Sequence, residues 1–265
     1  PAVMATDMAL GLLREAAASG VRTLVPFFRG EPLLHPDILP ILREAKQLGM
    51  TIQIASNATL LDAAKAEGLL GLGLDFISFS VDSITPQTYE KSRKNAELGV
   101  TIANIERFLD LRARTTAATT VQVSAVLGAL PPDEERAFVD FWLDRADRVR
   151  LYPPHSEGGN FGALPNGAKA VTTRRLPCLK PVTDMVVLAD GSVAVCNHDW
   201  DRGSLPPLGS WPAQSLAAIY AGPAYAALRA RHATGDCAGI KPCEGCDHWQ
   251  APYLSGGLAG ALYTR

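Results

Sequence analysis

The feature that most constrains the fold is a unit that repeats along residues 21–152: an apolar stretch, a polar loop and then a helical pattern. Short, β-rich apolar stretches predict five strands, at 23–28, 51–55, 75–79, 121–127 and 148–152. Apolar residues at helical spacing predict helices at 6–18, 36–48, 60–70, 85–93, 104–114 and 131–145. Strands that alternate with helices through short joints form a parallel sheet with right-handed crossovers, so we expect an α/β fold.

The helix at 6–18 stands before the first predicted strand, which implies a further strand upstream of it. Six strand–helix units form an open, partial (β/α)6 TIM-like barrel rather than a closed eight-fold one. We assign residues 1–152 to this barrel, 153–177 to a linker or substrate-contacting loop, and 178–265 to a small module of a β-hairpin and helices. His155 and Glu157 in the loop are interpreted as solvated residues, with ligand contact as the alternative.

Polar residues follow three consecutive strands at the point where each strand ends. They are Gly30, Glu31 and Pro32 after the first strand, Ser56 and Asn57 after the second, and Ser80 and Asp82 after the third. Ligands bind at the carboxyl edge of parallel sheets, so this arrangement favours a binding site over three ordinary helix caps. Gly30 allows close approach of a ligand, and Pro32 holds Glu31 extended, so we expect the Glu31 carboxylate to face an ammonium group.

All five cysteines lie near the C-terminus, at Cys178, Cys196, Cys237, Cys243 and Cys246. An odd number gathered at one end favours a metal or iron–sulfur site in a reducing cytoplasm over disulfides. A hairpin over 185–195 brings Cys178 and Cys196 together, and Cys243 and Cys246 share one turn. Four thiolates hold either zinc or an iron–sulfur cluster, and the residues alone do not decide between them. Cys237 is interpreted as a spare buried thiol, with a further ligand as the alternative.

Composition excludes several classes of partner. The net charge is −2, which provides no electrostatic attraction to nucleic acid or an acidic membrane surface. No run of 18 apolar residues occurs, and residues 1–20 lack the pattern of a secretory signal, so we expect a cytoplasmic protein. The apolar fraction of 47% is sufficient for a large core.

Together these segments resemble the radical S-adenosylmethionine (SAM) enzymes that carry a C-terminal SPASM or twitch module. Residues 29–34, RGEPLL, resemble the Gly-Gly-Glu-Pro motif of the family, with Arg29 in place of the first glycine. Ser56-Asn57 resembles the Thr-Asn pair of these enzymes, and residues 79–83 resemble the segment that faces the ribose and the methionine carboxylate. The spacing of Cys178, Gly191 and Cys196 resembles the opening of SPASM modules.

The resemblance implies two kinds of cofactor. SAM would be held through Gly30, Glu31, Pro32, Ser56, Asn57, Ser80 and Asp82. One auxiliary [4Fe–4S] cluster would be bound by Cys178, Cys196, Cys243 and Cys246. The Cys-x-x-x-Cys-x-x-Cys motif that binds the SAM-cleaving [4Fe–4S] cluster is absent from this sequence, and we expect this second cluster on an N-terminal segment upstream. A degenerate enzyme without radical chemistry is the alternative.

The function that the resemblance implies is hydrogen abstraction by a 5′-deoxyadenosyl radical. The single auxiliary cluster favours oxidation of a small polyhydroxylated natural product such as an aminocyclitol or a sugar, with a flavodoxin or ferredoxin as electron donor. One alternative is epimerisation or crosslinking of a ribosomal precursor peptide, in which Cys237 would return a hydrogen atom. Another is a non-catalytic protein with a structural zinc site. No residue is identified as the catalytic acid or base.

Overall fold

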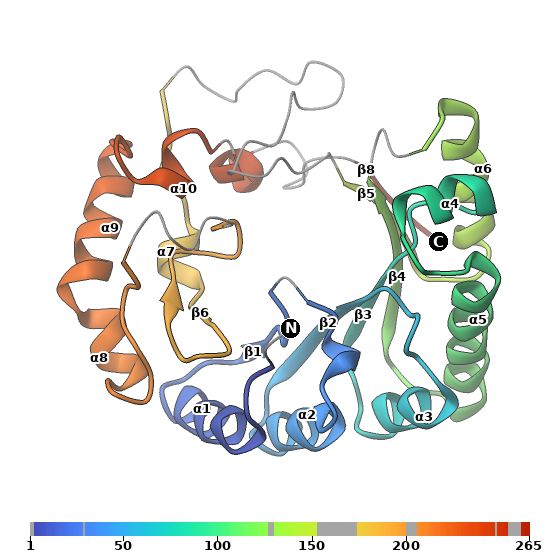
Figure 1. Ribbon diagram of the computed structural model, residues 1–265, viewed down its shortest axis with the longest axis horizontal. Coiled ribbons are helices and arrows are strands. Elements are labelled where there is room, and N and C mark those ends of the chain that lie inside the picture. The colour runs from blue at the N-terminus through green and yellow to red at the C-terminus, as the bar shows by residue number, and fades with distance from the viewer. Residues whose placement is uncertain are drawn as a thin grey trace. The chain divides into compact units, whose positions relative to one another are not determined.

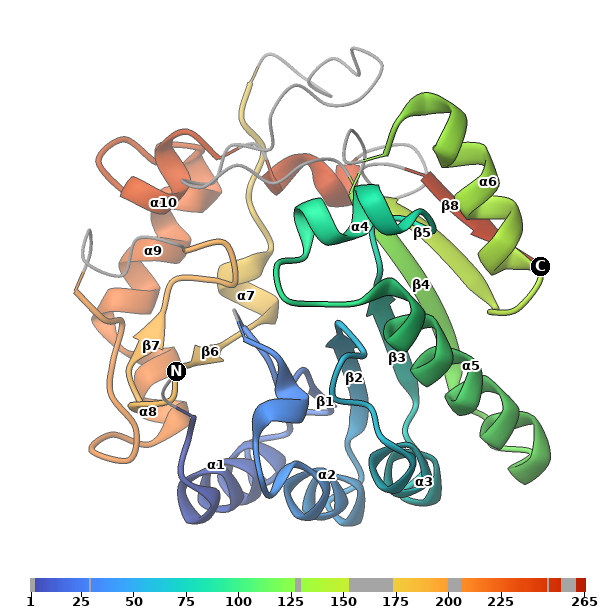
Figure 2. The same ribbon diagram turned by 45° about the vertical axis from the view of Figure 1, so that its right-hand side comes forward.

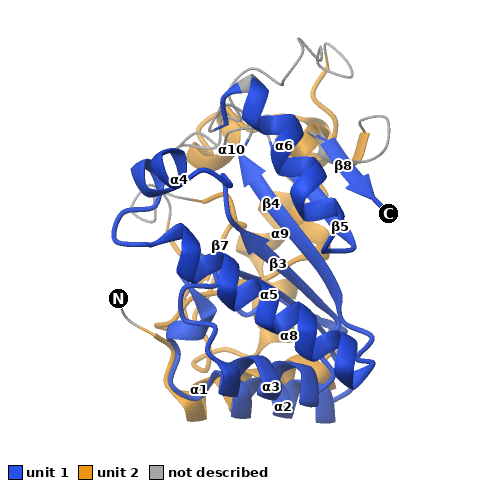
Figure 3. Cartoon of the chain, turned by 90° about the vertical axis from the view of Figure 1, so that its right-hand side faces the viewer, with its two compact units in different colours: residues 1, 20–152, 260–265 blue, residues 2–19, 153–259 orange. Residues whose placement is uncertain are grey.

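The computed structural model describes residues 3–28, 30–126, 130–152, 174–199, 206–246, 248–253 and 261–265. Two compact units make up the chain (Figure 3): unit 1 comprises residues 1, 20–152 and 260–265, and unit 2 comprises residues 2–19 and 153–259. The predicted division into three consecutive segments therefore differs from these units at both ends. The first helix belongs with the C-terminal residues, and the last strand belongs with the sheet. The predicted linker falls largely on residues 153–173, which lie outside the described residues.

Unit 1 is built on a mixed sheet in the order β1-β2-β3-β4-β5-β8 (Figure 1). The first five strands pair in parallel, and the last pairs antiparallel with β5. This confirms the predicted α/β class with a partial barrel. The strands are β1 (Thr23–Leu24), β2 (Thr51–Ser56), β3 (Phe76–Ser80), β4 (Thr120–Val126), β5 (Arg148–Tyr152) and β8 (Ala261–Thr264).

Helices connect the parallel strands and cover one side of the sheet (Figures 1 and 2). They are the 3-10 turn η1 (Pro32–Leu34) and the helices α2 (Ile38–Gln47), α3 (Ala63–Gly71), α4 (Pro86–Ser92), α5 (Leu98–Thr115) and α6 (Pro132–Leu143). No helix in the described parts of the chain combines the length and the apolar character needed to cross a membrane.

The register of the strands gives the sheet one apolar and one polar face. Residues paired across parallel strands point to the same side. Phe79 pairs with Val123, which pairs with Val149, and all three are fully buried. Phe79 meets Phe108 of α5 edge to face with ring centroids 5.6 Å apart, so this apolar face is the one that the helices cover. The residues on either side of these in sequence, such as Ser78 and Ser80, point to the opposite face.

Three elements differ from the predicted ones for identifiable reasons. The first strand is two residues long instead of six, because Pro26 has no N–H to continue the ladder. Helix α5 begins at Leu98 rather than at 104, since burial of Leu98 and Thr101 offsets the cost of Gly99 within the helix. Strand β8 was not predicted at all, because its pairing with β5 joins residues more than a hundred positions apart.

Two aspartates fix the register at the amino edge of the sheet. Asp75, just before β3, accepts hydrogen bonds from the backbone N–H of Ile52 and from Lys46 Nζ, each at 2.8 Å. Asp147, just before β5, accepts from the backbone N–H of Val121 at 2.7 Å and also pairs with Arg112. Each carboxylate therefore joins its own strand to the preceding one at this edge.

Unit 2 gathers short elements around an apolar cluster that includes Val193, Trp211 and Ile219. The hairpin pairs Val187 with Val193, and its turn places Gly191 at φ +84°, a conformation that favours glycine. The elements are α1 (Thr6–Ala18), α7 (Lys180–Thr183), β6 (Val186–Val187), β7 (Val193–Ala194), α8 (Leu216–Ala221), α9 (Pro223–Thr234), α10 (Lys241–Glu244) and the 3-10 helix η3 (His248–Tyr253).

Helix α1 is tied to the rest of unit 2 through the carboxylate of Glu15. One oxygen accepts a hydrogen bond from Trp211 Nε1 at 2.6 Å, and the other accepts from the backbone N–H of Leu216 at 2.5 Å. Met8 and Leu12 of the same helix pack against the apolar cluster. Because Leu216 opens α8, the carboxylate also lies at the positive end of that helix.

Replacing Glu15 by Gln should destabilise unit 2. The amide would place a donor NH₂ against one of two groups that are themselves donors, at a cost of about 1–3 kcal/mol. Denaturant unfolding followed by tryptophan fluorescence measures the change, with Asp7→Asn on the exposed face of the same helix as the control. Equal midpoints for both variants would contradict the proposed anchoring role.

Candidate functional site

The Glu31 carboxylate brings two of the predicted site loops together. Its Oε1 atom accepts hydrogen bonds from Ser56 Oγ at 2.8 Å and from the backbone N–H of Leu33 at 3.1 Å. Its Oε2 atom accepts from the backbone N–H of Asn57 at 2.8 Å. The carboxylate therefore connects η1 to the end of β2, at the carboxyl edge of the sheet.

The backbone of Glu31 has φ −91° and ψ 116°, the extended conformation expected before Pro32. The carboxylate, which was expected to face an ammonium group, is contacted by groups of the chain itself. Three N–H and O–H donors already occupy it, and an ionised carboxylate has about four acceptor positions. Capacity for one further donor remains. A Cβ atom built on Gly30 would meet nothing within 4 Å, so the space beside this glycine is open.

The loop after β2 is held in one conformation by side-chain hydrogen bonds. Ala58 is buried at φ +59°, and its backbone N–H donates to Ser56 Oγ at 3.0 Å. Its carbonyl accepts from Asn104 Nδ2 of α5 at 2.9 Å. The Asn57 side-chain oxygen accepts from Thr59 through both its N–H, at 3.0 Å, and its Oγ1, at 2.7 Å. Asn104, a buried amide inside a helix, was missed by the sequence analysis.

The loop after β3 is organised by Asp82, which is 8% exposed and has φ +67°. Its Oδ2 atom receives two guanidinium nitrogens of Arg93, at 2.8 and 2.6 Å, and its Oδ1 atom accepts from the backbone N–H of Val126 at 3.2 Å. The backbone N–H groups of Val81 and Asp82 both reach the Ser124 carbonyl. Asp82 thus fixes this edge of the sheet, and its expected contact with a ribose stays a prediction. Ser80 lies opposite Ser124 in the register.

The four predicted cluster ligands lie within unit 2 and influence one another electrostatically. Burial raises the pKa of Cys196 to about 12, the backbone N–H of His198 lowers it, and nearby Cys246 and Cys178 raise it further. Burial also raises the pKa of Cys243, and the neighbouring thiols of Cys196, Cys237, Cys246 and Cys178 raise it further. That these four thiols form one set of cluster ligands stays a prediction.

Two of the predicted ligands, Cys196 and Cys246, are each followed two residues later by a histidine, a Cys-x-His pattern that the sequence analysis did not note. The backbone N–H of His198 donates to Cys196 Sγ at 3.3 Å, and that of His248 donates to Cys246 Sγ at 3.4 Å. The two imidazole rings are in contact, with centroids 3.8 Å apart and planes tilted by 49°. Backbone amides directed at sulfur stabilise thiolates and are one of the ways in which proteins tune iron–sulfur clusters.

The donor chemistry of these residues fits an iron–sulfur cluster. The four predicted ligands are soft sulfur donors, two of them receive backbone hydrogen bonds, and burial favours ligation over exposure of a free thiolate. Among the described residues, no group of three or more His, Cys, Asp or Glu side chains is placed to hold a metal ion.

Cys237 is 4% exposed and packs in an apolar cluster with Cys243, Val195 and Leu228. Its sulfur contacts the imidazole nitrogens of His232 at 3.7 and 3.9 Å. This environment suits a packed thiol better than one that reaches a substrate. That Cys237 is a spare thiol rather than a ligand stays a prediction. His155 and Glu157 lie outside the described residues.

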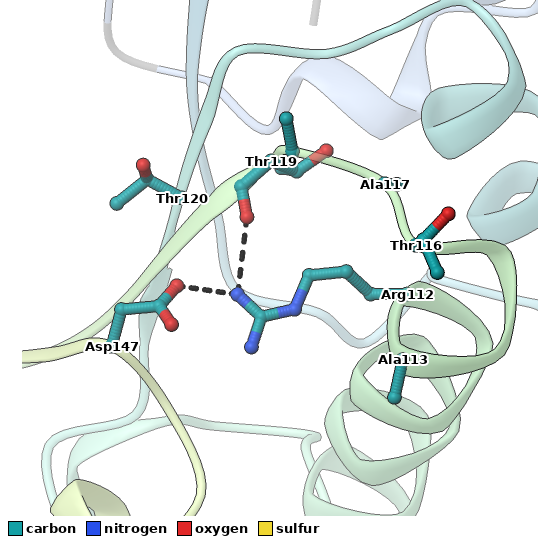
Figure 4. A pocket seen from close by; sticks show the side chains of 8 residues that line it. Arg112, Ala113, Thr116, Ala117, Thr119, Thr120 and Asp147 are labelled. Carbon is teal, nitrogen blue, oxygen red and sulfur yellow. Dashed lines mark hydrogen bonds and ion pairs between the residues drawn. The ribbon is translucent and has the colours of Figure 1, made fainter.

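A depression of about 410 Å³ lies at the opposite edge of the sheet (Figure 4). Arg112 occupies it, donating to the Thr119 carbonyl at 3.1 Å and pairing with Asp147. Because Thr119 and Asp147 precede β4 and β5, this is the amino edge, where residues support stability rather than chemistry. We therefore place the candidate site at the carboxyl edge.

Comparison with known proteins gives two matches to sequence families. A profile described as the Radical SAM superfamily matches residues 1–134, and one described as an iron-sulfur cluster-binding domain (SPASM) matches residues 178–247. The GTP 3′,8-cyclase of Chlorobaculum tepidum is 31% identical over 151 residues, which cover 56% of this chain and 43% of the relative. The chain spans less than half the length of the curated relatives it matches first.

Two solved structures resemble the fold. SuiB of Streptococcus suis aligns with a TM-score of 0.67 at 15% identity, over 96% of this chain and 69% of that one. BtrN in complex with AdoMet and 2-DOIA aligns with a TM-score of 0.61 at 14% identity, over 92% of this chain and 80% of that one. At these identities the likeness shows the fold alone.

Replacing Glu31 by Gln should destabilise unit 1. The new NH₂ group would face at least one of the three donors that the carboxylate now accepts, at a cost of about 1–3 kcal/mol. Thermal unfolding by circular dichroism measures the effect. Glu67→Gln, at an exposed position on α3, is the matched control. Equal melting temperatures for the two variants would contradict a stabilising role of the Glu31 carboxylate.

Stability should also fall in acid because of His232. Burial, aided by Arg175, lowers the pKa of this histidine from 6.5 to about 4. Between these values the unfolded chain binds a proton that the folded chain does not, so stability decreases as pH falls from 6.5 towards 4, by up to about 3 kcal/mol. Denaturant titrations at a series of pH values should show a shallower dependence for His232→Gln. If the pH dependence of the unfolding free energy is the same in His232→Gln as in the unaltered protein, the effect does not come from His232.

Proposed function

Because the chain belongs to the radical SAM superfamily, we propose that it is a radical enzyme that oxidises a small polyhydroxylated molecule such as a sugar or an aminocyclitol. Its two matched domains indicate SAM and [4Fe–4S] clusters as cofactors. When bound, these cofactors supply a 5′-deoxyadenosyl radical that removes a hydrogen atom from the substrate. The residues of the chain have to bind, orient and shield the reactants.

The carboxyl edge of unit 1 supplies the groups that would hold SAM. Glu31 keeps capacity for one more donor, which the ammonium of SAM provides, and the space beside Gly30 is open. The loops that bear Asn57 and Asp82 are fixed before any ligand arrives, which lowers the entropic cost of binding. Four thiols of unit 2 would hold the auxiliary cluster, at Cys178, Cys196, Cys243 and Cys246.

The observation that carries the substrate class is the polar face of the sheet. Opposite the helix-covered face, β3, β4 and β5 present hydroxyl and amide side chains, including Ser78, Gln122 and Ser124. A molecule with many hydroxyl groups matches such donors and acceptors better than an apolar peptide side chain does. In an alcohol oxidation the 5′-deoxyadenosyl radical would take the first electron from the substrate as part of a hydrogen atom, and the auxiliary cluster could accept the second. A flavodoxin or ferredoxin would supply the separate electron that cleaves SAM.

A peptide substrate is the second candidate. One relative, from Gluconobacter oxydans, is named a PqqA peptide cyclase, and SuiB has been solved with its precursor peptide SuiA. Anaerobic incubation of the full-length protein with SAM and dithionite tests both candidates. Formation of 5′-deoxyadenosine that rises with sugars or aminocyclitols supports the first, and a rise with precursor peptides alone supports the second. No 5′-deoxyadenosine under any condition contradicts radical chemistry.

Iron content tests the auxiliary cluster and separates it from a structural zinc site. Reconstituted full-length protein should contain about eight iron atoms if two [4Fe–4S] clusters are present. Alanine at Cys178, Cys196, Cys243 or Cys246 should remove about four of them, because the auxiliary cluster would lose one of its four thiolate ligands. Cys237→Ala is the control and should keep the full iron content. Zinc in place of iron in the unaltered protein would contradict the proposal.

A further inference from the structure

The hydroxyl group of Tyr225 in α9 is buried and unpartnered. The side chain is 0% exposed, and its Oη atom has no hydrogen-bond partner in the parts of the chain that the structure describes. A buried tyrosine hydroxyl normally has such a partner, because a donor removed from water without one costs free energy that a phenylalanine ring would not. The position of this hydroxyl therefore points to a partner other than the described side chains and backbone.

Tyr220 of α8 shows how a tyrosine in the same surroundings pairs its hydroxyl. It is 38% exposed, and its hydroxyl donates to the Val182 carbonyl of α7 at 2.8 Å. The two tyrosine rings lie with their centroids 5.7 Å apart. The more exposed hydroxyl, which water could reach, is thus bonded within the chain, whereas the buried hydroxyl of Tyr225 is not.

The ring of Tyr225 is held from several sides, which fixes the position of its hydroxyl. It packs in the apolar cluster of unit 2 with Val193 and Trp211. The guanidinium carbon of Arg229 lies 5.5 Å from the ring centre, and Arg229 Nη2 donates to the Tyr220 carbonyl at 2.8 Å. Turning the hydroxyl towards solvent would break these contacts.

The buried face of α9 runs along segments that carry predicted cluster ligands. The helix lies beside the hairpin and α7 (Figures 1 and 2). Tyr225 and Leu228 are three residues apart, so they share one face of the helix. Leu228 packs with Val195 and with the predicted ligand Cys243, and Val195 directly precedes the predicted ligand Cys196. Tyr225 therefore lies one helical turn from a residue that contacts the surroundings of two predicted ligands.

Nearby charges place the hydroxyl close to the same segments. Burial raises the pKa of Tyr225 to about 12, Arg229 opposes this effect, and Cys196 and Asp184 add to it. Asp184 is the C-cap of α7, the short helix that follows Cys178. The hydroxyl is therefore protonated at neutral pH, and it is available as a donor near two segments that bear predicted ligands.

The sulfur atoms of an iron–sulfur cluster are acceptors for such a donor, and hydrogen bonds to them are one of the factors that set the reduction potential of the cluster. Reduction adds one electron, so the hydrogen bond strengthens and stabilises the reduced form more than the oxidised form. We propose that Tyr225 donates a hydrogen bond to a sulfur atom of the auxiliary cluster and thereby raises its reduction potential.

This proposal rests on the auxiliary cluster of the proposed function and deepens that function, because a higher potential suits a cluster that accepts an electron. After hydrogen abstraction, the substrate radical would give one electron to the oxidised cluster and the proton of its hydroxyl group to solvent, and would become a carbonyl compound. Tyr225 is then a positioning residue, which acts through the cluster and not on the substrate.

The reduction potential of the auxiliary cluster tests the proposal without substrate. Reconstituted full-length protein is titrated anaerobically with dithionite and followed by electron paramagnetic resonance. SAM binds the SAM-cleaving cluster, so the signal that added SAM leaves unchanged belongs to the auxiliary cluster. In Tyr225→Phe, we expect unchanged iron content and an equilibrium constant for reduction that is about tenfold lower, equivalent to about 59 mV for one electron. Tyr220→Phe, which loses a hydroxyl bonded to the Val182 carbonyl, is the matched control and should keep the potential.

Stability before reconstitution gives a second readout. Tyr225→Phe should be at least as stable as the unaltered protein, because the hydroxyl removed has no partner in the described chain, whereas Tyr220→Phe should be less stable. An equal or higher potential in Tyr225→Phe, or an equal fall in Tyr220→Phe, would overturn the proposal. A marked loss of stability in iron-free Tyr225→Phe would also overturn it, since the hydroxyl would then be bonded within the chain. Absence of the auxiliary cluster from the unaltered protein contradicts the proposed function as well, whereas a bound cluster with an unaltered potential contradicts this proposal alone.

Discussion

The pairing register of the parallel sheet is the constraint on which the rest of unit 1 depends. A shift of one residue in β4 would turn Val123 to the polar side and press Ser124 against the helices. The cost of burying such a hydroxyl group without a partner exceeds any local preference of the strand. The carboxylates of Asp75 and Asp147 hold this register at one edge of the sheet, and so they also determine which side chains form the polar face.

At the carboxyl edge of the sheet, acidic side chains form hydrogen bonds within the chain itself. Glu31 and Asp82 are the most plausible ligand-binding carboxylates by sequence, yet each accepts three hydrogen bonds from the chain itself. The loops that they join are thereby fixed, and Asn57 and Ser80 are presented in defined positions. Pre-organisation of this kind reduces the entropy lost on binding. Glu31 can both fix its loop and contact a ligand directly, because its Oε2 atom can accept one further hydrogen bond. At Asp82, the salt bridge to Arg93 makes positioning the larger role.

The sequence predicted the order of strands and helices well because each depends on local periodicity. It could not predict β8, since nothing near residue 261 indicates a partner in β5. Similarly, RVRLY in β5 alternates polar and apolar residues, which reads as a strand with one solvent-facing side. Only the register shows that Arg150 lies buried beside Ser124. The loops that bear Asn57 and Asp82 follow β2 and β3 as expected, but the partners of Glu31 and Asp82 are set by contacts between distant segments.

In unit 2, the secondary structure is too short to be stable by itself, and we expect ligation to contribute more of the stability. Its hairpin strands are two residues long and the helices beside Cys178 and Cys243 have four residues each, lengths at which neither element is stable alone. Burial raises the pKa of Cys178 and Cys196, so in the absence of metal these thiols are protonated and contribute only weak interactions. Iron–sulfur ligation would convert them into strong, directional bonds. Metal binding and folding are coupled in such modules, and the apolar contacts of α1 with Trp211 then supply the part of the stability that does not depend on iron.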